Sequence, residues 1–215
     1  MTDRYRLTRG QNVFLAKRRM VDCIYNSAKL EGCNVTFPET YTILQGVNVG
    51  SVALDDIQTI LNLRDAWRFV LAAVDEPFTL EYLCKLNGHI SRNESLAWGV
   101  LRTGNIGISG TEYLPPVPTQ ESAQALFDAP FDSATERAIH FFMRACRAQL
   151  FWDGNKRTAT LAANKIMLQA GAGILTVKDG DVLEFNRRLL EYYNTDDMSL
   201  LDQWLCENCI EGITV

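Results

Sequence analysis

Apolar residues recur at helical spacing over most of the chain. In residues 13–30, Val21, Ile24 and Ala28 fall on one face of a helix, and Gly32 follows where such a helix ends. A capping box, "TFPE" at 36–39, opens a short second helix. Later patterns predict helices over 53–74, 79–86, from about 120, and over 133–149, 155–169, 181–193 and 199–210. The pattern therefore predicts an all-α fold, a bundle of about eight helices.

One stretch, from Trp98 to Pro118, departs from the helical pattern. In "GVLRTGNIGISG" (99–110), apolar and polar residues alternate on either side of "TGN", which is typical of a β-hairpin. The adjacent prolines Pro115 and Pro116 then exclude both a helix and a central strand. We therefore expect one small β-hairpin within an otherwise helical chain.

The composition narrows the class of protein. The 215 residues suggest a single domain over 1–215, and 47% hydrophobic with 22% charged residues is ordinary for a soluble globular chain. The net charge of −5 argues against binding of nucleic acid or an anionic membrane over the whole surface. The charged N-terminus lacks the apolar core of a secretory signal, and no apolar run approaches the roughly 18 residues of a membrane span. We expect a cytoplasmic protein with no membrane and no nucleic-acid partner.

The cysteines and histidines are interpreted as structural. The six cysteines are expected to be reduced and mostly buried. Cys206 and Cys209 have the spacing of a redox pair, but they lie on a helical pattern and no second pair completes a zinc site, which favours packing. His89 and His140 are likewise expected to pack or to lie at the surface.

Five polar residues, Asp153 to Arg157, interrupt the apolar helices in "QLFWDGNKRTATLAANK" (149–165). Gly154 allows a sharp turn, and the first amides of the helix that follows have no intrahelical acceptor and lie at its positive end. Lys156 and Arg157 add two cations, and Asp153 offers the hard oxygen that Mg²⁺ prefers. The local chemistry leaves two interpretations: a site for the phosphates of a magnesium–nucleotide complex, or a capped helix start with solvated cations.

This stretch resembles the motif of the Fic/Doc family, His-Pro-Phe-x-(Asp/Glu)-Gly-Asn-(Gly/Lys)-Arg-x-x-Arg, through Phe151, Asp153, Gly154, Asn155, Lys156 and Arg157. Two other segments agree with it. "RTGNIGISGTEYLPPVP" resembles the family's flap hairpin and Pro-Pro segment, and "NSAKLEG" resembles its inhibitory motif (Ser/Thr)-x-x-x-Glu-(Gly/Asn). The resemblance covers about 20–170 and implies the Fic fold, with 1–35 as an inhibitory-type helix, 99–118 as the flap and 149–160 as the motif loop and helix start.

The resemblance also implies an activity and roles for residues. Fic proteins transfer AMP from ATP to a hydroxyl of a protein, with Mg²⁺, and the Doc branch transfers a phosphate instead. By position, Asp153 would bind the metal, Gly154, Asn155, Lys156 and Arg157 would bind the nucleotide phosphates, and Gln149 stands where the family has its catalytic base. Ser27, Glu31 and Gly32 would form the regulatory motif, and Gly107, Ile108 and Ser109 would hold the target protein at the flap.

Three departures from the family motif matter. Gln149 and Leu150 replace His-Pro, and an amide cannot accept a proton near neutral pH. Lys156 is the option found in Doc and in some Fic proteins. Thr160 replaces the second arginine, the usual partner of the inhibitory glutamate, so Glu31 would either lack an ion pair or pair with Lys156 or Arg157.

Several functions remain open at this point. The first is AMP transfer to a protein, low or altered because Gln149 replaces the base, with ATP, Mg²⁺ and a target at the flap. The second is an inactive nucleotide- or peptide-binding pseudoenzyme, and the third is a Doc-like protein kinase toxin. A helical interaction domain outside the family is a fourth alternative. A second copy of the chain is also considered as a partner, in a homodimer.

Overall fold

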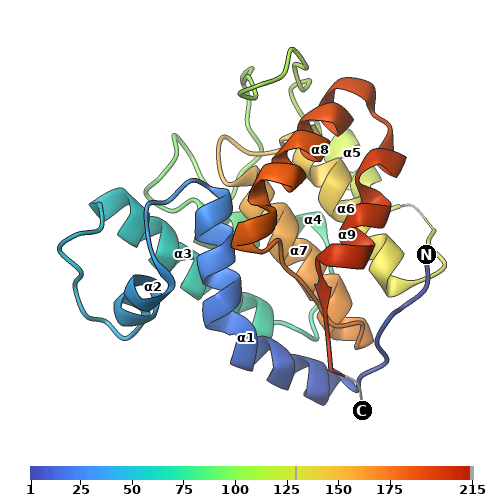
Figure 1. Cartoon of the computed structure of the whole chain (residues 1–215). Coiled ribbons are helices and arrows are strands. Elements are labelled where there is room, and N and C mark those ends of the chain that lie inside the picture. The colour runs from blue at the N-terminus through green and yellow to red at the C-terminus, as the bar shows by residue number, and fades with distance from the viewer. Residues whose placement is uncertain (129, 214–215) are drawn as a thin grey trace.

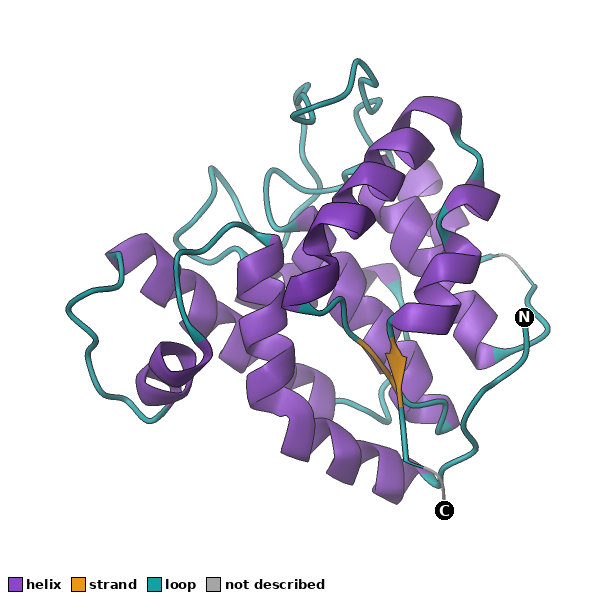
Figure 2. Ribbon diagram, in the orientation of Figure 1, coloured by secondary structure: helices purple, strands orange, loops and turns teal. Residues whose placement is uncertain are grey.

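The computed structural model describes residues 1–128 and 130–213. Within these residues the chain forms nine α-helices, three short 3₁₀ turns and one two-stranded antiparallel sheet (Figures 1 and 2). The helices are α1 (Arg9–Leu30), α2 (Phe37–Leu44), α3 (Leu54–Ala72), α4 (Leu80–Ile90), α5 (Gln120–Gln124), α6 (Ala134–Ala148), α7 (Asn155–Ala170), α8 (Val182–Thr195) and α9 (Asp202–Asn208). The 3₁₀ turns are Ala125–Phe127, Asp179–Asp181 and Met198–Leu200. The mostly helical class is therefore confirmed.

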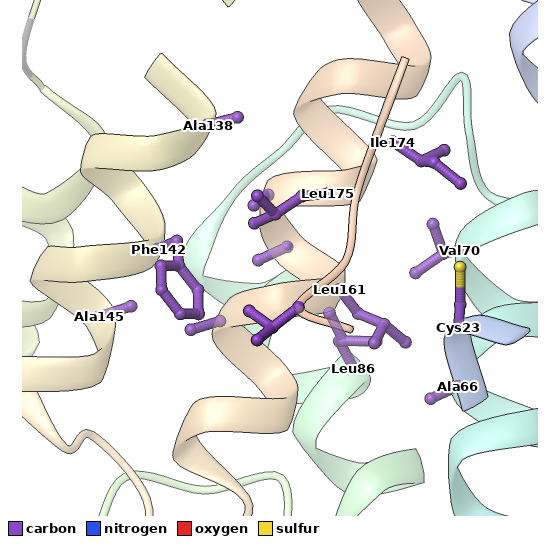
Figure 3. Packing of buried hydrophobic residues seen from close by; sticks show 14 of the residues in the cluster. Cys23, Ala66, Val70, Leu86, Ala138, Phe142, Ala145, Leu161, Ile174 and Leu175 are labelled. Atoms are coloured by element: carbon purple, nitrogen blue, oxygen red, sulfur yellow. The ribbon is translucent and has the colours of Figure 1, made fainter. Parts of the chain in front are cut away.

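Helix α7 is the centre of the fold. Most of its residues are buried, as expected for a helix that is covered on all sides. Helix α6 packs along it, and α1, α3 and α4 cover its other faces. Figure 3 shows this core, with Phe142 of α6, Leu161 of α7 and Leu86 of α4 close together. Because the N-terminal end of α7 carries the polar cluster, this packing fixes the site in the body of the protein.

The helix starts follow the polar signals in the sequence. Thr36 and Glu39 form the predicted capping box at the start of α2, with both reciprocal hydrogen bonds present. Thr79 caps α4 as predicted, through its hydroxyl and the N–H of Tyr82. Helix α4 then continues to Ile90, four residues beyond the predicted end. That extra turn brings Asn87 and Ser91 to the polar cluster.

The predicted β-hairpin is not formed at 99–118. This segment, called the flap loop below, is irregular in the structure (Figure 2), and the only strands among the described residues are β1 (Ile174–Leu175) and β2 (Ile210–Glu211), which pair elsewhere. The alternating pattern was a misleading signal. The carbonyls of Gly104, Pro115 and Pro116 accept hydrogen bonds from the Arg102 side chain, and the two prolines have no N–H to donate to a strand partner.

The N-terminal helix α1 is an integral part of the fold. The buried Asn12 amide donates to the carbonyls of Met167 and Gly173 at the C-terminal end of α7. Farther along α1, the Tyr25 hydroxyl donates to Asp179, 2.8 Å away. The side chains of Ile24 and Ala28 are fully buried in the core. These contacts hold α1 against the C-terminal end of α7 and against the 3₁₀ turn Asp179–Asp181.

The cysteines are all free thiols, as expected from the sequence. Cys209 is buried and Cys206 half-buried, which agrees with a packing role for this pair. Burial raises the pKa of Cys209 to about 12, so the thiolate needed for redox chemistry is not formed near neutral pH. No helix in the described parts of the chain combines the length and the apolar character that a bilayer crossing requires.

Lys165 is a buried cation in the middle of α7. Its ammonium donates to the carbonyls of Ala73 and Val74 at the end of α3, 2.5 and 2.7 Å away, and lies over the Tyr82 ring. Burial lowers the pKa of Lys165 to about 8. The unfolded chain, where this pKa is about 10.5, therefore binds more protons between these two values. The contribution of Lys165 to stability rises as the pH rises through this window.

We expect the Lys165→Met substitution to reveal this dependence. The free energy of unfolding of the wild type minus that of the variant should be larger at pH 10 than at pH 7, as measured by urea denaturation. Buried cysteines such as Cys23, whose pKa burial raises to about 12, act in the opposite direction but cancel in the difference. Substitution of the exposed Lys17 by Met serves as control. If the wild-type value minus the variant value falls as the pH rises, this account is contradicted.

Candidate active site

The turn between α6 and α7, residues 149–154, is called the motif loop. Gln149 ends α6 in the left-handed conformation, with φ 46° and ψ 60°, and Gly154 precedes α7 with φ 69°. Between them, Phe151 is buried and anchors the loop. The Asn155 side chain closes the turn, because it accepts from the N–H of Phe151 and donates to its carbonyl, both at 2.8 Å. The loop is thus a rigid, hydrogen-bonded structure.

Side chains at the C-terminal end of α4 hold the motif loop by hydrogen bonds. The Asn87 amide and the Ser91 hydroxyl both donate to the carbonyl of Asp153, each at 3.0 Å. The same Asn87 amide also lies 3.2 Å from the hydroxyl of Thr158 in the first turn of α7. Both side chains are fully buried. The loop and the start of α7 are therefore held in register with the core.

The first backbone amides of α7 are available to a ligand. The carbonyl of Gly154 accepts from Thr158, the first regular bond of the helix. Among the described residues, none accepts a hydrogen bond from the backbone N–H of Asn155, Lys156 or Arg157. These three donors lie at the positive end of a helix of 16 residues. They are the donors on which the sequence prediction of an anion site rests, and anion binding there stays a prediction.

A cavity of about 660 Å³ opens over these amides. Its wall brings together nine of the residues singled out from the sequence: Glu31, Gly107, Ile108, Ser109, Gln149, Asp153, Gly154, Asn155 and Lys156. The flap loop thus lies across the cavity from the start of α7. Ser27, Gly32 and Arg157 are not part of the lining. Segments far apart in the sequence therefore meet at one cleft.

One wall of the cavity was not found from the sequence. Asn186, Leu189, Leu190 and Tyr193 of α8 line it, together with Trp152 and Ile106. Figure 1 shows α8 beside the flap loop. Burial raises the pKa of Tyr193 far above its usual value, so its hydroxyl stays protonated. The amphipathic pattern of α8 predicts a buried face, but it does not say which surface that face covers.

Glu31 lies between the two cations of the motif. Its carboxylate is 3.5 Å from the ammonium of Lys156 and 3.7 Å from Nε of Arg157. This matches the alternative in which Glu31 pairs with these residues in place of the missing second arginine. Lys156 also donates to the carbonyl of Leu30, 3.0 Å away, at the C-terminal end of α1. The inhibitory-type segment is therefore bound to the start of α7.

Arg157 is not where the sequence interpretation put it. Its side chain is only 5% exposed, and its guanidinium binds Glu94 at 2.6 Å and Asp153 at 3.1 Å instead of lying over the cavity. Asn62 holds the other oxygen of Glu94 at 2.7 Å. Burial tends to lower the pKa of Arg157, but the carboxylates of Glu31 and Glu94 raise it above the usual value. The role of Glu94 carries no signal in the sequence.

Gln149 lines the cavity, but its side chain is engaged. Its amide donates to the carbonyl of Cys146 in the last turn of α6, 2.7 Å away. The backbone carbonyl of Gln149 accepts from Nε of Arg102 at 2.6 Å. No histidine takes its place: neither His89 nor His140 lines the cavity. His89 packs against the ring of Phe69 and His140 lies edge to face with Phe131, in keeping with the expected packing roles.

The sequence profile of the Fic/DOC family matches residues 77–167. Residues 77–167 form a Fic/DOC family domain. The matched residues include α4, the flap loop, α6 and most of α7, and hence the motif loop. No curated protein sequence matches the chain.

Solved Fic structures share the fold over nearly the whole chain. Fic-1 from C. elegans (residues 134–508) matches with a TM-score of 0.79 at 18% identity, covering 91% of this chain. A Fic family protein from Desulfovibrio desulfuricans G20 gives 0.74 at 17% identity and 90% coverage. A Fic domain containing signaling protein from Bacteroides thetaiotaomicron VPI-5482 has a TM-score of 0.73 at 18% identity and covers 94% of this chain. The chain spans 62%, 63% and 85% of these structures, in the same order.

Gly154 of the Fic domain has no room for a side chain. A Cβ at this position would collide with Ser91 and Ile90, and the positive φ adds strain for any other residue. We expect Gly154→Ala to lower the free energy of unfolding by about 2–4 kcal/mol, because both strain and overpacking act there. Urea denaturation measures this loss.

The matched control is Gly107→Ala, on the flap side of the same cavity. A Cβ at Gly107 meets no atom within 4 Å, so this variant should stay close to wild type in stability. Equal unfolding midpoints for the two variants would show that Gly154 is not held against α4 as described.

Proposed function

We propose that the Fic domain binds ATP with Mg²⁺ and transfers AMP to a hydroxyl of a protein held at the flap loop, at a low rate. The observation that carries the proposal is the set of three unpartnered amides at the start of α7, of which those of Asn155 and Lys156 belong to residues that line a cavity of about 660 Å³. A helix N-terminus open to a cleft of this size suits a polyphosphate. Membership of the Fic/DOC family supports transfer chemistry of this kind.

The residues present fit a magnesium ion that arrives with the nucleotide. Asp153 is 47% exposed on its side chain, and only one of its oxygens is bound by Arg157. In the described residues no three His, Cys, Asp or Glu side chains are grouped closely enough to hold a metal by themselves. Mg²⁺ commonly uses one or two carboxylates together with substrate phosphates. When bound, the ion would neutralise charge on the phosphates.

The α8 wall suits the rest of a nucleotide. Leu189 and Leu190 offer an apolar surface, and Asn186 offers a side-chain amide that can both donate and accept. Trp152, on the motif loop, adds an aromatic face to the same cavity. A base and ribose would lie there while the phosphates face the start of α7. Such a division of apolar and polar contacts is usual in small-ligand sites.

In the proposed reaction the target hydroxyl oxygen bonds to the α-phosphorus of ATP. The bond from that phosphorus to the bridging oxygen breaks, and pyrophosphate leaves. Gln149 cannot take the hydroxyl proton, which passes to solvent. Its amide can orient the hydroxyl once it leaves the carbonyl of Cys146. Catalysis then rests on positioning and on charge stabilisation, and the missing base costs about 10²- to 10⁴-fold in rate.

The cavity at the start of α7 is called the phosphate socket, or socket, below. The net charge around it disfavours the entry of a polyphosphate. Glu31, Glu94 and Asp153 contribute three negative charges, against two positive charges from Lys156 and Arg157, which leaves a net charge of −1. A polyphosphate entering this site competes with Glu31 for Lys156. Displacement of Glu31 would change the net charge from −1 to zero and free the ammonium of Lys156. We therefore assign Glu31 the role of an inhibitor that works without a second motif arginine.

A binding-only module is the second candidate. The observation that favours it is that two side chains of the motif already have partners. The Gln149 amide is bound to the carbonyl of Cys146, and the Arg157 guanidinium is bound to Glu94. In that case the domain would bind nucleotide and present the flap loop without transferring anything. The two candidates share the phosphate socket and differ only in turnover.

Calorimetry and mass spectrometry together separate these functions. We expect ATP·Mg²⁺ to bind the wild type or its Glu31→Gly variant at one site, and Lys156→Met to weaken that affinity at least tenfold. Lys85→Met, an exposed lysine on α4, is the matched control and should bind as the parent protein does. Incubation with ATP and a lysate should add AMP to a protein, whereas a Doc-like kinase would add phosphate and a binding module nothing. Absence of binding in both parent proteins would overturn the proposal.

A further inference from the structure

Arg102, at the start of the flap loop, is a buried cation without a carboxylate partner. Its residue is 1% exposed, and among the described residues it takes part in no ion pair. Burial lowers its pKa. An uncompensated buried charge is costly unless its donors are satisfied. The hydrogen bonds that satisfy Arg102 therefore show what it is placed to hold.

The guanidinium holds both ends of the flap loop. Nη1 donates to the carbonyl of Gly104 at 2.6 Å, and Nη2 donates to the carbonyls of Pro115 and Pro116 at 3.1 and 2.6 Å. The intervening residues 105–114 are thus closed into a loop whose base is one arginine. This loop carries Ile106–Ser109, which line the cavity. In place of strand pairing, one side chain gives the flap loop its shape.

The same residue holds the motif loop. Nε donates to the carbonyl of Gln149 at 2.6 Å, and the backbone N–H of Arg102 donates to the carbonyl of Leu150 at 3.0 Å. A second contact joins the two loops independently. A Cβ at Gly104 would lie 2.7 Å from the Trp152 ring, so the flap loop packs directly on the motif loop there.

We propose that Arg102 is a positioning residue that clamps the flap loop to the motif loop, so that a segment bound at Ile106–Ser109 and the side chain of Gln149 keep one fixed relation. A guanidinium presents five N–H donors in a rigid plane, and here four of these donors are committed to carbonyls from three chain segments. A lysine has a single nitrogen and cannot span these acceptors. The clamp rests on the fold alone and does not require the proposed nucleotide chemistry.

Fluorine NMR of the full chain tests the clamp without any ligand. Labelling with 5-fluorotryptophan gives one signal for each of Trp67, Trp98, Trp152 and Trp204, assigned by single Trp→Phe substitutions. In Arg102→Lys and Arg102→Met we expect the Trp152 signal to shift or broaden by more than its line width. The signal of Trp204, on α9, should stay within that limit. The N–H of Phe151 should also exchange with solvent at least tenfold faster than in wild type.

Lys165→Met is the matched control, because it also removes a buried cation that donates to backbone carbonyls, but far from the flap loop. A Trp152 signal that moves no more in the Arg102 variants than in Lys165→Met would overturn the clamp. A second readout uses the reaction. Transfer of AMP should fall at least tenfold in Arg102→Lys while the affinity for ATP·Mg²⁺ changes less than about threefold. If no variant binds ATP, the proposed function fails, and the Trp152 signal still decides the clamp.

Discussion

The Gln149→His substitution is expected to raise the rate of AMP transfer by about 10²- to 10⁴-fold, which is the usual contribution of a positioned base. The prediction applies to the Glu31→Gly background, where the socket is open. Position 149 lines the cavity, and its left-handed backbone suits histidine, which adopts that conformation more readily than most residues. Initial rates with labelled ATP, Mg²⁺ and a lysate measure the gain.

The control for this gain is Gln149→Asn, which changes the side chain but supplies no base. We expect its rate to stay near that of glutamine. A histidine variant as slow as the asparagine variant, with ATP bound normally, would contradict the role given to this position. The domain would then be a binding module, in line with the second candidate function.

Removal of the Glu31 charge is expected to tighten ATP·Mg²⁺ binding by about 10- to 100-fold. The carboxylate lies 3.5 Å from the ammonium of Lys156, in the position that an incoming phosphate would need. Glu31→Gln keeps the shape of the side chain and isolates the charge, and Glu31→Gly also removes the chain. Arg157 keeps Glu94 and Asp153 as partners in both variants, so the fold should be retained.

Calorimetry at two salt concentrations measures this effect. The gain should be larger at low ionic strength, because an exposed part of the interaction is screened by salt. Glu207→Gln, an exposed glutamate on α9, serves as the control for a change in net charge. An affinity that is the same for wild type and both Glu31 variants would show that Glu31 does not compete with the nucleotide.

The local signals in the sequence predicted most of the fold. Helical periodicity and capping residues such as Thr36 and Thr79 placed the helices, because these signals act within one turn of the chain. The prediction of a hairpin at 99–118 was wrong because it, too, used only a local signal. Alternation of apolar and polar residues is a local signal, but a strand needs a partner, and the Arg102 side chain takes the carbonyls that such a partner would use.

The candidate site was predicted to the extent that its residues lie in continuous motifs. Gln149, Asp153 and Lys156 meet Glu31 and the flap loop as the resemblance implied. The wall from α8 and the partner of Arg157 could not be found in this way. Leu189 and Tyr193 look like any amphipathic face, and Glu94 reaches Arg157 across 63 positions of sequence. Such contacts depend on how the helices pack, which no short pattern encodes.

The central claim is that the unpartnered amides at the start of α7 bind phosphate. A crystal structure of the Glu31→Gly protein with ATP and Mg²⁺ tests it most directly. The account predicts phosphate oxygens at about 3 Å from the backbone nitrogens of Asn155, Lys156 and Arg157, with Asp153 at the metal. Nucleotide bound elsewhere, or a socket still empty of phosphate at saturating ATP, would contradict it.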